Sequence, residues 1–164
     1  MIKRRGGCLC GAVRYELVGR PRIGVSCYCR DCQYISGGGP NYAMVVTRSD
    51  LVIARGKPRA YWTEGDSGRR VAREFCDICG TPLFTYTENK PGRVAVKVGS
   101  LDDPSDFKPH LAIWMSSAQP WHTLDIAVAR FQRLPRPGKY VIGEVLVAAL
   151  IKLARIIRPD AAKG

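Results

Sequence analysis

Short runs of alternating apolar and polar residues follow one another along most of the chain. Val13, Tyr15 and Leu17 share one face of the first run, and Gly19-Arg20-Pro21 ends it. A period of two residues is typical of β-strands, and Gly, Pro, Asn, Asp and Ser mark the turns between them. Similar runs occupy residues 23–26, 42–46, 51–54, 59–63, 71–75, 82–86, 94–98 and 111–115. This spacing, without helical periodicity between the runs, predicts an all-β body.

The pattern changes after Pro135-Arg136-Pro137-Gly138. Residues 143–158 have helical periodicity. One narrow face carries Glu144, Ala148, Lys152 and Arg155, and apolar residues cover the rest. We therefore predict a β domain over 1–135 and a C-terminal helical extension over 136–164. The helix is too short to span a bilayer. Its wide apolar face favours packing on the β domain or on the partner in a homodimer, whereas its few cations disfavour the alternative of a membrane-surface helix.

Four of the seven cysteines form two pairs that share a feature. Each pair is followed directly by glycine, Gly11 in one case and Gly80 in the other. A glycine with positive φ at this position lets the chain curl so that backbone N–H groups point at the sulfurs of a metal site. We therefore assign one closed, four-thiolate structural site to Cys8, Cys10, Cys76 and Cys79.

The other three cysteines lie within six residues, at Cys27, Cys29 and Cys32. Three ligands leave a metal with an open position, as in catalytic sites. Zinc on three thiolates carries a net negative charge, so it is a poor generator of hydroxide and favours binding an incoming sulfur as thiolate. A helical turn over residues 31–34 would also favour the Cys32 thiolate. The alternatives are a second structural site, completed by a histidine or a partner's ligand, and no resident metal.

Composition indicates a single soluble globular domain with a real core. The 164 residues are 46% hydrophobic and 24% charged. No apolar signal segment precedes Cys8, so we expect a reducing, cytoplasmic setting, where C-x-C and C-x-x-C spacings favour zinc over disulfides. The net charge of +12 offers an alternative function, a zinc-stabilised module that binds nucleic acid or an acidic protein. The 26 Lys and Arg residues are scattered, which disfavours nucleic acid.

Three motifs carry a family resemblance. The segments Gly7-Cys8-x-Cys10-Gly11, Cys27-x-Cys29-x-x-Cys32 and Phe75-Cys76-x-x-Cys79-Gly80-Thr81 resemble, in order and spacing, the glutathione-dependent formaldehyde-activating enzymes, a family that includes centromere protein V. The resemblance extends over roughly residues 5–133 and excludes the C-terminal helix. Tyr28 differs from the histidine that the family usually has at this position.

The resemblance implies a fold, two metals and a reaction. The implied fold has several coiled antiparallel sheets clamped by a zinc-ribbon-like structural site. The implied metals are two zinc ions per chain, a structural one on the four-cysteine group and a catalytic one on Cys27, Cys29 and Cys32. The implied reaction condenses glutathione with formaldehyde, which is carbon–sulfur lyase chemistry in reverse. We expect the two histidines, His110 and His122, to be structural and hydrogen-bonded.

Overall fold

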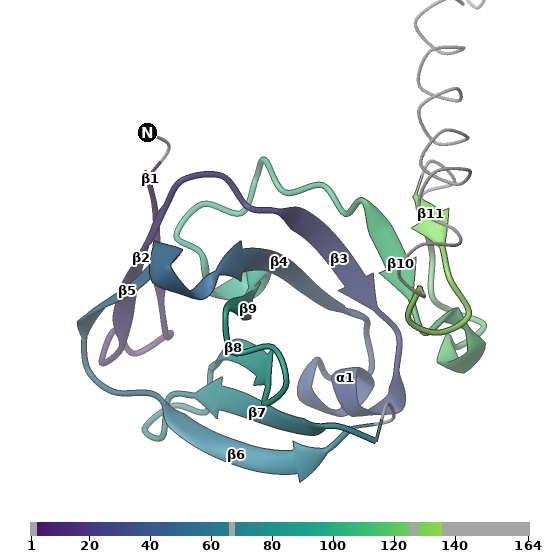
Figure 1. Cartoon of the computed structure of the whole chain (residues 1–164), viewed down its shortest axis with the longest axis horizontal. Helices are drawn as coiled ribbons and strands as arrows, with labels where there is room; N and C mark the ends of the chain where they lie inside the picture. The colour runs from purple at the N-terminus through teal and green to yellow at the C-terminus, as the bar shows by residue number, and fades with distance from the viewer. Residues whose placement is uncertain (1–2, 66–67, 125–127, 136–164) are drawn as a thin grey trace, which may run out of the picture.

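Two β-sheets form the body of the molecule in this computed structural model, which describes residues 3–65, 68–124 and 128–135. The smaller sheet has three strands in the order β1-β2-β5, and the larger has eight in the order β11-β10-β3-β4-β9-β8-β7-β6 (Figure 1). The strands are β1 Lys3–Gly7, β2 Arg14–Val18, β3 Ile23–Cys27, β4 Asn41–Thr47, β5 Leu51–Arg55, β6 Arg59–Glu64, β7 Arg70–Phe75, β8 Pro82–Thr87, β9 Arg93–Lys97, β10 Leu111–Ile113 and β11 Ala129–Arg130. The helices are α1 Arg30–Ile35 and the 3-10 turns η1 Arg48–Asp50, η2 Val98–Ser100 and η3 Met115–Ser117.

Every run of alternating residues singled out in the sequence coincides with a strand, so the prediction of a mostly β body is confirmed. Two strands were missed, β1 and β11. The residues of β1, Lys3-Arg4-Arg5-Gly6-Gly7, include no large apolar side chain, so the run has no hydrophobic alternation. Edge strand β1 instead pairs with β2. Glu16 of β2 forms ion pairs with Lys3 at 2.6 Å and with Arg5 at 3.2 Å.

The prediction that all strand pairs are antiparallel is wrong for β10. This strand runs parallel to both β3 and β11, while the other pairs are antiparallel. The connection from β9 to β10 consists of η2 and a loop. It crosses β4 and β3, so that β10 lies on the far side of β3. A crossover connection of this kind, about a dozen residues long, joins strands that point the same way.

The main hydrophobic core fills the space between the two sheets. Tyr15 and Leu17 of β2 face Phe84 and Val96 of the large sheet, and all four side chains are buried. The rings of Tyr15 and Phe84 meet edge to face with centroids 5.0 Å apart. The opposite face of the large sheet curls around α1, which lies inside the curve in Figure 1.

The predicted C-terminal helix and its homodimer interface fall outside the described residues, as does the whole of the proposed second unit, 136–164. Within the part of the chain that the structure describes, no helix is long and apolar enough to cross a bilayer.

Candidate metal centres

The four-cysteine group joins the two sheets. Cys8 and Cys10 lie in the connection between β1 and β2, and Cys76 and Cys79 lie in the connection between β7 and β8. All four sulfur atoms lie within 4.8 Å of one another. Segments that are more than sixty residues apart therefore meet at one point, as the spacing of the pairs predicted.

The distances between these sulfurs suit a tetrahedral metal site. The Cys8 and Cys10 sulfurs are 3.5 Å apart, and the Cys10 and Cys76 sulfurs are 3.8 Å apart. Four sulfurs at about 2.3 Å from a central zinc are about 3.8 Å from one another, whereas disulfide sulfurs are about 2.05 Å apart. All seven cysteines are free thiols, so the donor set fits a thiophilic metal and excludes crosslinks within this structure.

Glycines shape both turns in the way that the sequence predicted. Gly11 and Gly80 have φ values of +74° and +72°, and their N–H groups donate to the carbonyls of Cys8 and Cys76 at 3.0 and 2.8 Å. The Val13 N–H donates to the Cys8 sulfur at 3.1 Å. The two glycine bonds close the turns, and the Val13 bond directs an N–H dipole at a sulfur and stabilises negative charge on it.

Thr81 joins the two turns, a role that the sequence did not indicate. Its hydroxyl lies 3.1 Å from the Cys79 sulfur and accepts the Leu9 N–H at 3.1 Å. Hydrogen bonding from Thr81 lowers the pKa of Cys79 to about 5, which favours the thiolate that a metal needs.

The three-cysteine group lies where β3 runs into α1. Cys27 ends β3, Cys29 immediately precedes the helix, and Cys32 lies in its first turn. The three sulfurs lie within 4.8 Å of one another, with 3.6 Å between Cys27 and Cys29. Among the described residues, no histidine or carboxylate joins this group. The arrangement therefore offers three sulfur ligands, one fewer than a tetrahedral metal takes.

The acidic thiol in this group is Cys29. Hydrogen bonds from Cys27 and then Cys32 lower the pKa of Cys29 to about 3. Cys32 lies in the first turn of α1, where a helical turn was expected, but the neighbouring thiols dominate its pKa. The bond with Cys27 lowers the pKa of Cys32, but the bond with Cys29 and burial outweigh it and raise the value to about 12. One negative charge shared among three close thiols settles on one of them, because like charges at this distance repel.

Two cations lie close to the three thiols, and the sequence patterns did not identify either. Lys97 ends β9 and is only 5% exposed. Arg73 of β7 forms an ion pair with Asp31 of α1 at 2.6 Å, which ties the helix to the far side of the sheet. Both cations interact electrostatically with Cys29. The signal for Lys97 was its position in the otherwise apolar run 94–98.

Tyr28 does not take part in the three-cysteine group. Its side chain is buried with Ala112 and Val128 in a second, smaller cluster, and its ring lies 5.3 Å from that of His122. Successive side chains of an extended chain point to opposite sides, so Cys27 and Cys29 face the site while Tyr28 faces away. Tyr28 thus belongs to the packing behind the site and does not line it.

Buried Gln33 of α1 fixes the helix to the neighbouring segment. Its side-chain N–H group donates to the carbonyl of Tyr28 at 2.6 Å and to that of Ser117 at 2.8 Å. The carbonyl oxygen of the same side chain accepts a hydrogen bond from Arg30. These bonds satisfy a buried amide and hold the turn that presents Cys29 and Cys32.

The two histidines have structural hydrogen bonds, as expected. Nδ1 of His110 accepts the N–H of Gly24 at 3.0 Å. Nδ1 of His122 accepts the N–H of Gln119 at 3.1 Å, so its Nε2 donates to the carbonyl of Gly38 at 2.9 Å. Neither belongs to a metal-binding group.

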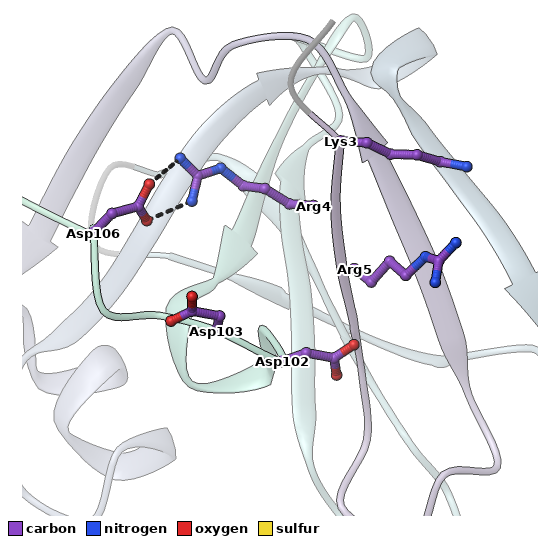
Figure 2. A pocket seen from close by; sticks show the side chains of 6 residues that line it. All are labelled: Lys3, Arg4, Arg5, Asp102, Asp103 and Asp106. Atoms are coloured by element: carbon purple, nitrogen blue, oxygen red, sulfur yellow. Dashed lines mark hydrogen bonds and ion pairs between the residues drawn. The ribbon is translucent and has the colours of Figure 1, made fainter.

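A charged pocket of about 670 Å³ lies beside β1, apart from both cysteine groups. Figure 2 shows Arg4 pointing to one side of the strand and Lys3 and Arg5 to the other. Arg4 forms two hydrogen bonds with Asp106, at 2.5 and 2.6 Å. These bonds raise the pKa of Arg4 and lower that of Asp106. Arg4 and Asp106 pair within the pocket, whereas Lys3 and Arg5 pair with Glu16 and Asp102 pairs with Arg14. We assign the pair of Arg4 and Asp106 a role in joining β1 to the loop before β10.

Comparison with known proteins agrees with the motifs. Residues 3–117 match the family model of the glutathione-dependent formaldehyde-activating enzymes. A relative from Halomonas elongata, provisionally named a glutathione-dependent formaldehyde-activating enzyme, is 27% identical over 119 residues, which cover 70% of this chain and 76% of the relative. The crystal structure of a Rhodobacter sphaeroides protein is 24% identical, with a TM-score of 0.48, over 64% of this chain and 91% of the other. The family match spans well over half of the sequence and includes all seven cysteines, so this chain belongs to the glutathione-dependent formaldehyde-activating enzyme family.

Proposed function

We propose that this protein is a zinc-dependent enzyme of the carbon–sulfur lyase type, which joins a thiol such as glutathione to formaldehyde or a related small electrophile. The observation that carries the proposal is the unequal division of the cysteines. Four sulfurs form a complete tetrahedral set, whereas three form a set with one position left for a substrate. Membership of the family supports this choice of thiol and aldehyde.

Zinc suits both groups. Its usual distance to sulfur reproduces the spacing between the thiols, and thiolates are its common ligands in structural sites. The four-cysteine group would hold a structural ion, and Cys27, Cys29 and Cys32 would hold a second one. When bound there, zinc stabilises a substrate sulfur as thiolate near neutral pH. The proposal therefore assigns two zinc ions to each chain. It also favours a cytoplasmic setting, because seven thiols stay reduced there.

The residues of the chain orient the reaction around these sulfurs. A new bond forms between the thiol sulfur and the carbonyl carbon, the carbon–oxygen π bond breaks, and the proton lost by sulfur is balanced by one gained at the new hydroxyl oxygen. The hydrogen bonds of Gln33 and the ion pair between Arg73 and Asp31 keep α1 fixed while this happens. A fixed position for the reacting groups lowers the entropic part of the barrier.

Exchange spectroscopy tests this activity directly. Proton NMR measures the exchange between free formaldehyde and its glutathione adduct, and we expect the zinc-loaded protein to accelerate it. The double variant Cys29→Ser, Cys32→Ser should bind one zinc instead of two, keep its fold and lose the acceleration. A wild-type rate equal to the uncatalysed rate, at two zinc ions per chain, would contradict the proposed reaction.

The second candidate is a binding module for an anionic partner. Besides the net charge of +12, a pocket of about 460 Å³ is lined by Arg22, Lys90, Gly92 and Arg93, without an acidic residue. This volume suits one anionic group better than a polyanion. Binding to nucleic acid or an acidic protein would weaken steeply with added salt. Affinity that is independent of salt, or no binding at low salt, would exclude this candidate.

A further inference from the structure

A single lysine is buried against the three-cysteine group. Strand register places it there: Cys27 of β3 is opposite Asn41 of β4, and Ala43, two residues further along β4, is opposite Lys97 of β9. Residues two apart on a strand, and residues opposite one another on neighbouring strands, share a face of the sheet. The side chains of Lys97 and Cys27 therefore lie on the same face.

The ammonium of Lys97 has no carboxylate to balance it. No Asp or Glu in the described part of the chain forms an ion pair with it, and its electrostatic neighbours are the three thiols and Arg73. Arg73 is itself paired with Asp31. A buried, unpaired ammonium is unfavourable, and among the described residues the groups near enough to compensate it are anionic sulfurs.

Burial and the thiols act on Lys97 in opposite directions. Burial is the larger influence and lowers the pKa of Lys97 overall, although the neighbouring Cys32 and Cys27 act to raise it. The same attraction works both ways, because a charged lysine also stabilises negative charge on sulfur. The attraction between Lys97 and these cysteines is a property of the protein's own side chains.

We propose that Lys97 makes the three-cysteine site selective for an anionic fourth ligand, a thiolate, over a neutral one. The inference rests on the proposed function and names the ligand class of that site. A divalent ion on three thiolates has one formal negative charge, which Lys97 cancels. Arrival of a fourth thiolate then leaves one net negative charge around the site instead of two. Without Lys97 the second negative charge would be uncompensated, and a neutral ligand would be favoured.

Cobalt(II) in place of zinc provides a test that does not depend on turnover. Its absorption reports each new ligand, and the filled four-cysteine group gives a constant background. Glutathione is the anionic probe and imidazole is the neutral one. We expect Lys97→Met to weaken glutathione binding about ten-fold or more, since an opposite charge at close range shifts such equilibria by one to three powers of ten. Binding of imidazole should stay equal or strengthen.

Three further variants sharpen the experiment. Lys97→Gln removes the charge with a polar side chain and should behave like Lys97→Met, while Lys97→Arg keeps the charge and should retain tight glutathione binding. Lys57→Met makes the same change at an exposed position between β5 and β6 and controls for net charge.

Wild-type affinity for glutathione in both neutral variants, Lys97→Met and Lys97→Gln, would overturn the inference. Equal weakening of both probes, or loss of one metal, would overturn it as well, because Lys97 would then support the metal and not the choice of ligand. The proposed reaction is tested by exchange NMR, so the two can fail separately.

Discussion

Tyr15 connects the buried core to the strand that ends at Lys97. Ser100 donates its only hydroxyl proton to the carbonyl of Lys97 at 2.7 Å, so the Tyr15 hydroxyl donates to Ser100, also at 2.7 Å. The ring packs on Phe84, and burial raises the pKa of Tyr15 to about 12. A neutral phenol is therefore part of the folded state.

This phenol predicts how stability depends on pH. The folded pKa is raised above the ordinary value of 10.0, so the stabilisation is fully present below pH 10 and is lost as pH rises through about 12. Between pH 7.5 and pH 11 the loss is about 1 kcal/mol. Tyr15→Phe should be less stable than wild type by about 1 kcal/mol at pH 7.5, because a buried hydrogen bond is lost. By pH 11 the difference should vanish. Urea denaturation at both values measures this.

Tyr61→Phe is the matched control, because Tyr61 is 60% exposed on β6. We expect its unfolding free energy to follow that of wild type at both pH values. A constant gap between Tyr15→Phe and wild type across this range would show that ionisation of Tyr15 does not affect stability.

At the scale of elements, the turn between β7 and β8 can be tested separately from the rest of the four-cysteine group. Gly80 has a φ of +72°, and an added Cβ would meet nothing within 4 Å. Gly80→Ala should therefore destabilise the protein only through its backbone conformation, by about 1–2 kcal/mol. Thermal or urea unfolding of the zinc-loaded protein measures the change.

Gly92→Ala is the control for this turn. Its Cβ would also meet nothing within 4 Å, and its φ does not lie in the left-handed region. We expect its stability to stay within about 0.5 kcal/mol of wild type, as for ordinary surface changes. Equal effects at both glycines would contradict the role assigned to the positive φ of Gly80.

The short helix α1 depends on its neighbours more than on its own length. It has six residues and no side-chain cap at its first turn. An isolated helix of this length is unstable in water, so packing must maintain it. Gln33 bonds it to the carbonyls of Tyr28 and Ser117, and Asp31 pairs with Arg73 of β7. The geometry of Cys29 and Cys32 is thus determined by contacts outside the helix.

At the scale of the whole molecule, the two cysteine groups should release metal in two steps. The four-cysteine group joins the small sheet to the large one, while the three-cysteine group joins only β3 and α1. Titration with a chelator should remove one zinc without change in far-ultraviolet circular dichroism, and the second together with unfolding. A zinc indicator and circular dichroism, recorded on the same samples, follow both steps.

The variant Cys29→Ser, Cys32→Ser isolates the second step. It should release a single zinc, and unfolding should accompany that release. Removal of both ions from wild type at one chelator concentration, before any loss of structure, would show that the four-cysteine group is not needed to hold the sheets together.

Several features of the molecule were determined by the sequence alone. Alternation of apolar residues is a local property, and it placed nine of the eleven strands that the described residues form. The spacing of the cysteines and the glycines after Cys10 and Cys79 is local too, and it separated a group of four sulfurs from a group of three. The same ordered motifs indicated the family that comparison confirmed.

Other features were decided by the tertiary structure, because they depend on pairs of residues that are distant in the chain. Parallel β10 follows from a crossover, and charged β1 is stabilised by Glu16 of its neighbour. Burial of Lys97 against the three thiols requires the registers of β3, β4 and β9 together. Local periodicity holds no information on such registers, so sequence patterns identified the sulfurs of the site but not the cation that compensates them.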